Sequence, residues 1–454
     1  MIKPLISNLT TRFFLALCVV SVFAGSPAAA NDNQVDLLSL YLRASLFDAE
    51  LAAAEADYEA AKTAVSLARS NVRPQASFGY QLSFTDVNSD SQGSFVDQGP
   101  SLSLRQTIFN KIHLSTIDQA KASTKQAEAQ LEAQRQDLIL RVSEAYFDVL
   151  EAESELAFRR SELDAIERQK EQNERRFDVG LVAITDVKDA QAQFDLATAQ
   201  EIAAANQVAA AQEALTVLTG ANIGAIAQLR DNAPLISPTP EDPEQWINTA
   251  QDQNLPLRVA ELAVLVAKAE LAGSRAERYP TLDLVGLATQ NTTTQGLSSD
   301  VDVGEIRLEL NLPLLSGGRT TAMVRQTKAQ LRAARHQEEL QRRVTIQQTR
   351  NAYRNVVANI AQANALKQAL ESTQKSLEAQ EAGFAEGLLT SLEVLRSLRD
   401  TFQAQSDYAA ARYQYIDNFL LLKSSAGILN ESDVELINGW LEARPSATVD
   451  ASSN

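Results

Sequence analysis

The chain has 454 residues and a formal net charge of −17, with 58 acidic and 41 basic side chains. This charge argues against a nucleic-acid partner, because binding to phosphates needs clustered Lys and Arg. One cysteine and two histidines, His113 and His336, are too few for a zinc or iron–sulfur site, so we expect no metal and no cofactor. The chain is rich in Ala, Gln, Glu and Leu and poor in aromatic residues, which favours long helices over a mixed α/β enzyme.

The N-terminal segment 1–30 predicts a cleaved signal peptide. A basic start and the apolar run 13–25 lead to an A-x-A pattern that ends at Ala30. The run is shorter than the roughly 20 apolar residues that a membrane-spanning helix needs. A lipid anchor on Cys18 is the less favoured alternative, since the bulky Leu17 precedes it. We therefore expect export, with cleavage after about Ala30.

The rest of the chain predicts two copies of one structural unit, 31–240 and 241–430. Matching segments recur about 206 residues apart through helices, strands and loops alike, and a constant offset of that kind indicates duplication. The matching residues include Pro74 with Pro280, Tyr146 with Tyr353, Phe177 with Phe384, and Gly180 with Gly387.

Each unit is predicted to begin with one helix, 35–71 in the first copy and 244–277 in the second. Apolar residues recur at helical spacing in both segments. Each helix ends before a proline, because proline disfavours the helical conformation of the residue that precedes it.

A pair of β-strands follows each helix, at 75–84 with 101–109 and at 280–290 with 305–315. Alternation of apolar and polar residues over nine to eleven positions is typical of a strand that crosses a membrane. An ordinary soluble hairpin gives the same pattern, so the strands alone leave both interpretations open.

Two very long helices come next, 113–178 and 319–384, followed by the return helices 185–218 and 390–425. Neither long tract contains proline. At 1.5 Å per residue each tract spans about 100 Å, a length that indicates a coiled coil or a helical tube.

The turns between these helices carry a repeated motif, FDVGL in the first copy and FAEGL in the second. Gly180 and Gly387 are suited to a left-handed cap at the end of a helix. Thr185 with Asp186, and Ser391 in the second copy, offer oxygens that can start the return helices.

Four membrane strands would leave two unpaired edges, and open edges in lipid expose unsatisfied backbone groups. We therefore expect the strands to close into a barrel with other copies of the chain, and a trimer would supply twelve strands. The alternative is a soluble periplasmic coiled-coil structural protein, which would not need two strand pairs. The acidic residues fall at helix-surface spacing among basic ones, so we do not expect an enzyme.

The chain resembles the TolC family of outer-membrane efflux proteins. The resemblance rests on RFDVGLVAITDVKDAQAQFD (176–195) together with NVRPQASF, LRQTIFN, AYFDVLEAESEL, RYPTLDL and LPLLSGGRTTAMVRQTKAQL. It implies a mainly α-helical trimeric channel-tunnel with a twelve-stranded outer-membrane β-barrel, a long α-helical periplasmic barrel and an equatorial domain. The C-terminal segment 431–454 would contribute to that equatorial domain and end in a disordered tail.

The same resemblance implies a function. The chain would be a passive outer-membrane exit duct for multidrug efflux, type I protein secretion or both. An inner-membrane efflux or ABC transporter and a periplasmic adaptor would recruit it. The adaptor would dock at the hairpin tips, formed here by Gly180, Leu181, Gly387 and Leu388.

The hairpin tips of the family also close the periplasmic mouth through a polar latch. Thr185 and Asp186 match the latch residues of the first hairpin. The family has a tyrosine and an arginine on the second hairpin, and this chain has Phe384 and Leu389 there instead. Neither can hold Asp186 through a polar contact.

An acidic ring in the family matches Glu393 and Arg396 in this chain. Because one acid is replaced by a base, Arg396 can pair with Glu393 one helical turn away. We therefore expect a mouth held by apolar packing of Phe384, Leu388 and Leu389. A solvated helix pair without a role in gating is the alternative for Glu393 and Arg396.

Overall fold

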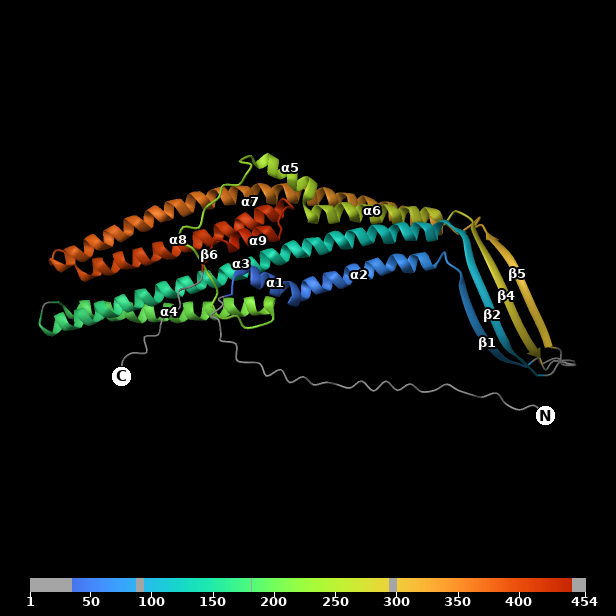
Figure 1. Ribbon diagram of the computed structural model, residues 1–454, viewed down its shortest axis with the longest axis horizontal. Coiled ribbons are helices and arrows are strands. Elements are labelled where there is room, and N and C mark those ends of the chain that lie inside the picture. Colours follow the sequence, from blue (N-terminus) through green and yellow to red (C-terminus); the bar gives the residue numbers. More distant parts are fainter. Residues whose placement is uncertain (1–34, 87–93, 181, 294–299, 443–454) are drawn as a thin grey trace, which may run out of the picture.

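The computed structural model describes residues 35–86, 94–180, 182–293 and 300–442. The predicted signal peptide, Leu181 and the last residues of the predicted tail lie outside these ranges. The protein is elongated, with a four-stranded sheet at one end and the turns of two helical hairpins at the other (Figure 1). The prediction of a mainly helical chain is confirmed.

The two halves of the chain repeat the same order of helices and strands, except that the second half has the additional helix α9 before its last strand. The first half contains α1 (Leu37–Phe47), α2 (Ala49–Ser70), β1 (Gln75–Thr85), β2 (Phe95–Asn110), α3 (Lys111–Asp178), α4 (Ile184–Thr219) and the short β3 (Gln228–Leu229). The second half contains α5 (Pro243–Gln253), α6 (Leu255–Ala276), β4 (Thr281–Thr293), β5 (Asp300–Asn311), α7 (Arg319–Ala385), α8 (Ser391–Ser425), α9 (Glu431–Asn438) and β6 (Leu441–Glu442).

The prediction of one continuous helix at the start of each half is wrong. The chain is extended at Asp48, between α1 and α2, and at Asn254, between α5 and α6. Each side chain accepts a hydrogen bond from a backbone N–H of the following helix, Leu51 N at 2.7 Å and Leu257 N at 2.9 Å. A capping side chain of this kind starts a new helix.

The four long strands form one antiparallel sheet in the order β1-β2-β4-β5. The central pairing of β2 with β4 joins the two halves, with Leu104 opposite Gly286 and Arg105 opposite Val285. β2 is longer than predicted and begins at Phe95.

The predicted strand 305–315 is wrong at its C-terminal end, since β5 ends at Asn311. β2 leads directly into α3, whereas a short loop separates β5 from α7. Pro313 lacks an N–H for strand pairing. Gly317 and Gly318 then take positive φ angles of 59° and 83°, which turn the chain out of the sheet.

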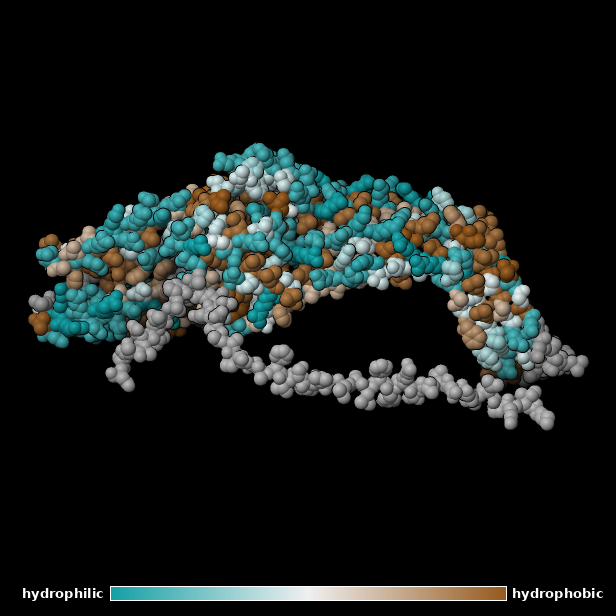
Figure 2. Space-filling view, in the orientation of Figure 1, coloured by the Kyte–Doolittle hydropathy of each residue, from teal (hydrophilic) through white to brown (hydrophobic). Residues whose placement is uncertain are grey.

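One face of the sheet is apolar and exposed. Alternate side chains on all four strands point to this face, and Figure 2 shows hydrophobic residues along the strands. The opposite face carries polar and charged residues, among them Ser103, Arg105, Asp283 and Arg307. The exposed apolar set is Phe78, Tyr80, Leu82, Phe84, Leu102, Leu104, Leu284, Ile306, Leu308 and Leu310. Among the described residues, no helix is both long and apolar enough to cross a membrane.

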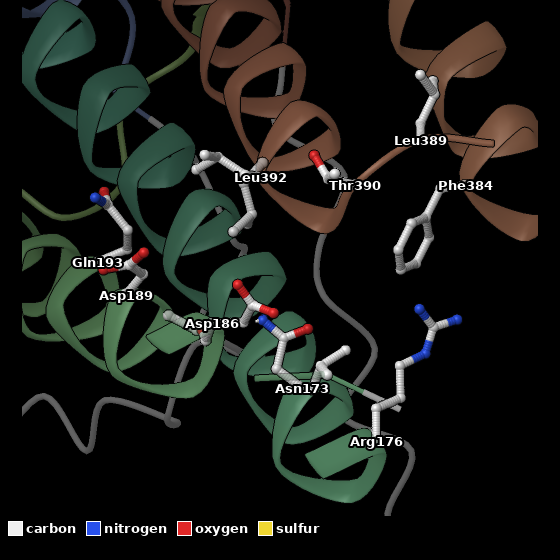
Figure 3. A pocket seen from close by; sticks show the side chains of 12 residues that line it. Asn173, Arg176, Asp186, Asp189, Gln193, Phe384, Leu389, Thr390 and Leu392 are labelled. Atoms are coloured by element: carbon white, nitrogen blue, oxygen red, sulfur yellow. Dashed lines mark hydrogen bonds between the residues drawn. The ribbon is translucent and has the colours of Figure 1, made fainter. Parts of the chain in front are cut away.

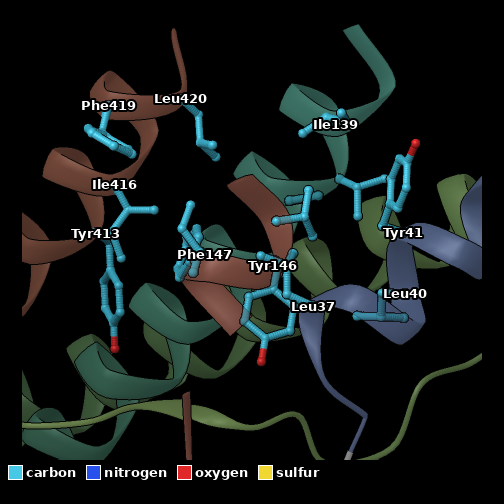
Figure 4. Packing of buried hydrophobic residues seen from close by; sticks show 14 of the residues in the cluster. Leu37, Leu40, Tyr41, Ile139, Tyr146, Phe147, Tyr413, Ile416, Phe419 and Leu420 are labelled. Carbon is cyan, nitrogen blue, oxygen red and sulfur yellow. The ribbon is translucent and has the colours of Figure 1, made fainter. Parts of the chain in front are cut away.

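The largest hydrophobic core lies at mid-length, where α1, α9 and the β3–β6 pair pack around α3 and α8 (Figure 4). Tyr146 is fully buried there, and its hydroxyl donates a hydrogen bond to Ala227 O at 2.7 Å. The ring of Phe147 stacks on Tyr413 with centroids 5.9 Å apart. We call this region the belt. Burial of its apolar side chains is the main stabilising contribution that the single chain provides.

From the belt toward the hairpin turns, small side chains line the contacts of the return helices. Ala190, Ala197, Ala204 and Ala211 are all buried on α4 and recur every seven residues. On α8 the buried positions Ser397, Ala404 and Ala411 have the same spacing. Small residues let each return helix lie close to its long partner.

Candidate functional site

The turn of each hairpin is built around a glycine in the left-handed conformation. Gly180 has φ 74° and Gly387 has φ 73°. Gly180 N donates to Phe177 O at 2.9 Å, and Gly387 N donates to Phe384 O at 3.0 Å. Leu388 N also reaches Gly383 O at 2.9 Å, which closes the last turn of α7.

Of the residues predicted to start the return helices, Asp186 does so, whereas Thr185 and Ser391 do not. Asp186 accepts a hydrogen bond from Ala183 N at 3.2 Å, and Glu393 accepts one from Thr390 N at 2.7 Å. Thr185 lies inside the first turn of α4, so its predicted role as a cap is wrong. In the second copy Thr390 is the capping position, and Ser391 is already helical.

The predicted ion pair between Glu393 and Arg396 is also wrong. Within the described residues, no ion pair joins the two side chains. The carboxylate of Glu393 instead accepts from the backbone N–H of Thr390 and from its hydroxyl at 2.9 Å. These hydrogen bonds lower the pKa of Glu393, and the field of Arg396 is the smallest of the causes.

The two hairpin tips enclose a pocket of about 210 Å³ (Figure 3), which we call the tip pocket. Three of the predicted gate residues line it, namely Asp186, Phe384 and Leu389, whereas Thr185, Glu393 and Arg396 do not. The first hairpin supplies Asn173, Arg176, Val182, Asp186, Asp189, Ala190 and Gln193, and the second supplies Phe384, Leu389, Thr390, Leu392 and Leu395.

Arg176 is one of the residues of this pocket that the sequence prediction missed. Its guanidinium carbon lies 4.5 Å from the centroid of the Phe384 ring, within the range of a cation–π contact. In Figure 3 the guanidinium and the ring point toward each other across the gap between the hairpins. Arg176 begins the motif RFDVGL, but sequence spacing within one helix cannot reveal a contact with a residue two hundred positions away.

Leu389 does not fill the space between the hairpins. It folds back on α7, so that a Cβ on Gly383 would lie only 2.9 Å from its Cδ1 atom. Leu388 is 80% exposed in the single chain. Within one subunit, Phe384 and Leu389 therefore line the same pocket, whereas Leu388 does not.

A second group of polar contacts joins the hairpins nearer the belt. Glu162 of α3 is 2% exposed and pairs with Arg159 at 2.8 Å and with Arg399 of α8 at 3.6 Å. Arg399 also donates a hydrogen bond to Gln193 of α4. Arg399 thus contacts both helices of the first hairpin.

The architecture defines a class of protein. Two long antiparallel helical hairpins continue a sheet that has one exposed apolar face, as expected for a subunit of a membrane channel with a helical extension. The family model for the outer membrane efflux protein matches residues 40–221 and again residues 246–427.

Relatives of known identity match over most of the chain. It is 34% identical to the outer membrane protein TolC of Vibrio cholerae, over 90% of this chain and 94% of that protein. It is 33% identical to TolC of Escherichia coli, over 91% of this chain and 86% of that protein. The alkaline protease secretion protein AprF of Pseudomonas aeruginosa is 28% identical over 88% of this chain and 86% of AprF.

Solved structures share the fold. The Campylobacter jejuni CmeC outer membrane channel superposes with a TM-score of 0.75 at 16% identity, covering 89% of this chain and 90% of CmeC. VceC from Vibrio cholerae has a TM-score of 0.74 at 19% identity, covering 86% of this chain and 96% of VceC. The chain therefore belongs to the outer membrane efflux protein family. It is an outer-membrane exit duct, and the alternative of a soluble structural protein is not favoured.

Proposed function

We propose that three copies of the chain form one channel-tunnel with a twelve-stranded barrel in the outer membrane. The observation that carries this proposal is the isolated four-stranded sheet, whose edge strands β1 and β5 have no partner on their outer sides among the described residues. Lipid cannot satisfy the backbone groups of an open edge, so the sheet must pair with sheets of other copies.

The two faces of the sheet support the same arrangement. The exposed apolar face, with Phe78 and Ile306 more than 70% exposed, suits contact with lipid. The polar face, with the Arg105–Asp283 pair at 2.8 Å, suits a water-filled lumen. Side chains alone would fill the interior of a barrel of eight strands. Twelve strands enclose a wider interior.

The proposal includes a division of the chain. The signal peptide 1–30 directs export, the units 31–240 and 241–430 form the barrel and the helical tube, and 431–454 joins the equatorial belt. The two separate matches of the family model support the two units. The packing of α9 and β6 in the belt supports the place of the C-terminal segment.

We further propose that an inner-membrane transporter and a periplasmic adaptor recruit this duct. Relatives include a protease secretion protein and CzcC, a cobalt-zinc-cadmium resistance protein of Cupriavidus metallidurans. Their names support protein secretion and metal resistance as the processes that such a duct serves. Leu388 is exposed beside Gly387 at one tip, which suits docking of an adaptor, and Gly180 and Leu181 are the proposed counterparts at the other tip.

The tips are also the proposed gate. In a trimer the helices Ser391–Ser425 would surround the axis, and the residues predicted for the gate are Thr185, Asp186, Phe384, Leu389, Glu393 and Arg396. The tip pocket supports this role for three of them, because it lies between the two hairpins that would have to separate.

The test is to purify the mature chain in detergent, determine the mass of the particle and record its conductance in planar lipid bilayers. We expect a particle of three chains and discrete single-channel steps. A monodisperse monomer, or a trimer that never conducts, would contradict the proposal.

A further inference from the structure

We infer that Arg176 and Phe384 form the latch that holds the two hairpin tips of each subunit together. This inference rests on the proposed gate and names the contact that keeps it closed. The latch differs from a carboxylate–arginine link because the cation lies on the first hairpin and its partner is an aromatic ring.

The position of the contact suits a latch. Arg176 lies two residues before the end of α3, and Phe384 lies one residue before the end of α7. The 4.5 Å separation between guanidinium carbon and ring centroid therefore joins the last turns of the two long helices. Both residues are partly buried and line the tip pocket, so the cation is partly removed from water. Partial desolvation strengthens a cation–π contact.

The neighbouring charges leave Arg176 available for this contact. The adjacent Arg175 pairs with Glu171 of its own helix at 2.7 Å. Across the part of the chain that the structure describes, Arg176 has no carboxylate within ion-pair distance, although Asp186 and Asp189 line the same pocket. The carboxylate of Asp186 is already hydrogen-bonded to Ala183 N.

The two copies of the motif differ at the residue that precedes the phenylalanine. Phe177 and Phe384 occupy equivalent places, but the residue before them is Arg176 in the first copy and Gly383 in the second. Gly383 provides the room into which Leu389 folds, away from the ring of Phe384. Each subunit therefore contains one such contact, with the cation from the first copy and the ring from the second.

The chemical nature of the two side chains bears on how the latch is released. A guanidinium stays protonated at every physiological pH, and a phenyl ring does not titrate. The two side chains themselves therefore supply no pH-dependent group, and we expect a binding partner to release the latch; Asp186 and Asp189 are the acidic residues that share its pocket.

The experiment measures the open-to-closed ratio of single channels formed by the full mature trimer. Arg176→Gln and Phe384→Leu should each raise this ratio about fivefold or more, from the strength typical of a cation–π contact. The double variant should exceed the stronger single variant only slightly, because both changes remove the same contact. Phe384→Trp should retain closure, since indole is the better ring for a cation.

Two matched controls come from the same turn of α3. Arg175→Gln removes a neighbouring arginine that pairs within its own helix, and Phe177→Leu removes the equivalent phenylalanine. Both should gate as the unmodified channel does. The latch is wrong if Arg176→Gln and Phe384→Leu leave the ratio unchanged, or if their effects multiply in the double variant. An unmodified trimer that forms no channel would refute the proposed function itself and is recognised before any variant is compared.

Discussion

Asp48 and Asn254 occupy equivalent positions in the two halves, and each ends one helix and caps the next with a side-chain oxygen. Their other contacts differ. The carboxylate of Asp48 binds Arg141 through oxygens 2.8 and 3.1 Å from the guanidinium nitrogens. Asn254 donates from its amide nitrogen to Ser425 O at 3.0 Å. The same break in the backbone is therefore tied to a charge in one half and to a helix carbonyl in the other.

The first prediction concerns this difference. Asn254→Asp keeps an oxygen for Leu257 N but replaces the donor to Ser425 O with a second, buried acceptor. We expect a loss of about 2 kcal/mol in the free energy of unfolding. Asp48→Asn is the control. It should lower the free energy of unfolding by less, because Arg141 keeps its 2.7 Å contact with Asp137. Thermal unfolding of the purified proteins measures both, and equal losses would contradict the assignment.

The second prediction concerns pH. Burial, and then the fields of Asp148, Glu144 and Glu151 on α3, raise the pKa of Asp417 on α8 to about 7. Within the described chain, its Oδ1 atom has no hydrogen-bond partner. The folded state therefore holds a proton that the unfolded state releases near pH 4. Stability should fall as the pH rises from about 4 to about 7 and remain low above that range.

Asp417→Asn tests the direction of this pH dependence. The amide cannot ionise, so the variant should be more stable than the unmodified protein at pH 8, on the order of 2 kcal/mol. The difference should shrink toward pH 4. A series of thermal melts between pH 4 and pH 8 gives the result. A variant whose melting temperature falls with pH as steeply as that of the unmodified protein would show that another group is responsible.

The third prediction concerns the buried carboxylate between the hairpins. Glu162→Gln removes the charge that faces Arg159 and Arg399, and we expect a loss of about 1–3 kcal/mol. Glu171→Gln, on the same helix, breaks only the exposed pair with Arg175 and should cost less than about 0.5 kcal/mol. Thermal unfolding compares the two variants, and the idea fails if they are equally stable.

The fourth prediction concerns the turns. Among the described residues, an added Cβ at Gly180 or Gly387 meets no neighbouring atom, so the cost of Gly180→Ala and Gly387→Ala comes from the left-handed backbone, about 1 kcal/mol each. Gly224 also has open space around it but does not have a positive φ, so Gly224→Ala should be neutral. Thermal unfolding of the three purified variants checks this prediction. A loss of stability in Gly224→Ala equal to that in Gly180→Ala would argue against backbone strain as the cause.

Local rules predicted the order of helices and strands, because hydrophobic spacing, proline and glycine act over a few residues. They did not predict the breaks at Asp48 and Asn254, since both residues are also tolerated inside helices. The place of Glu393 in an acidic ring came from the family resemblance, and no local rule predicted that its carboxylate would cap its own helix. The contact of Arg176 with Phe384 was not predictable, because it depends on how two hairpins distant in sequence lie against each other.

The alanines at positions 190, 197, 204 and 211 have a mechanical consequence for the hairpins. A straight α-helix drifts by about 20° for every seven residues, so a strict repeat of seven keeps its contact only by left-handed supercoiling. Across the three heptads of this stripe, the difference between a coiled and a straight hairpin amounts to roughly 60° of rotation. The belt holds one end of the hairpin, and the contact of Arg176 with Phe384 lies at the other. A slight unwinding along the hairpin would therefore rotate the tip relative to the belt.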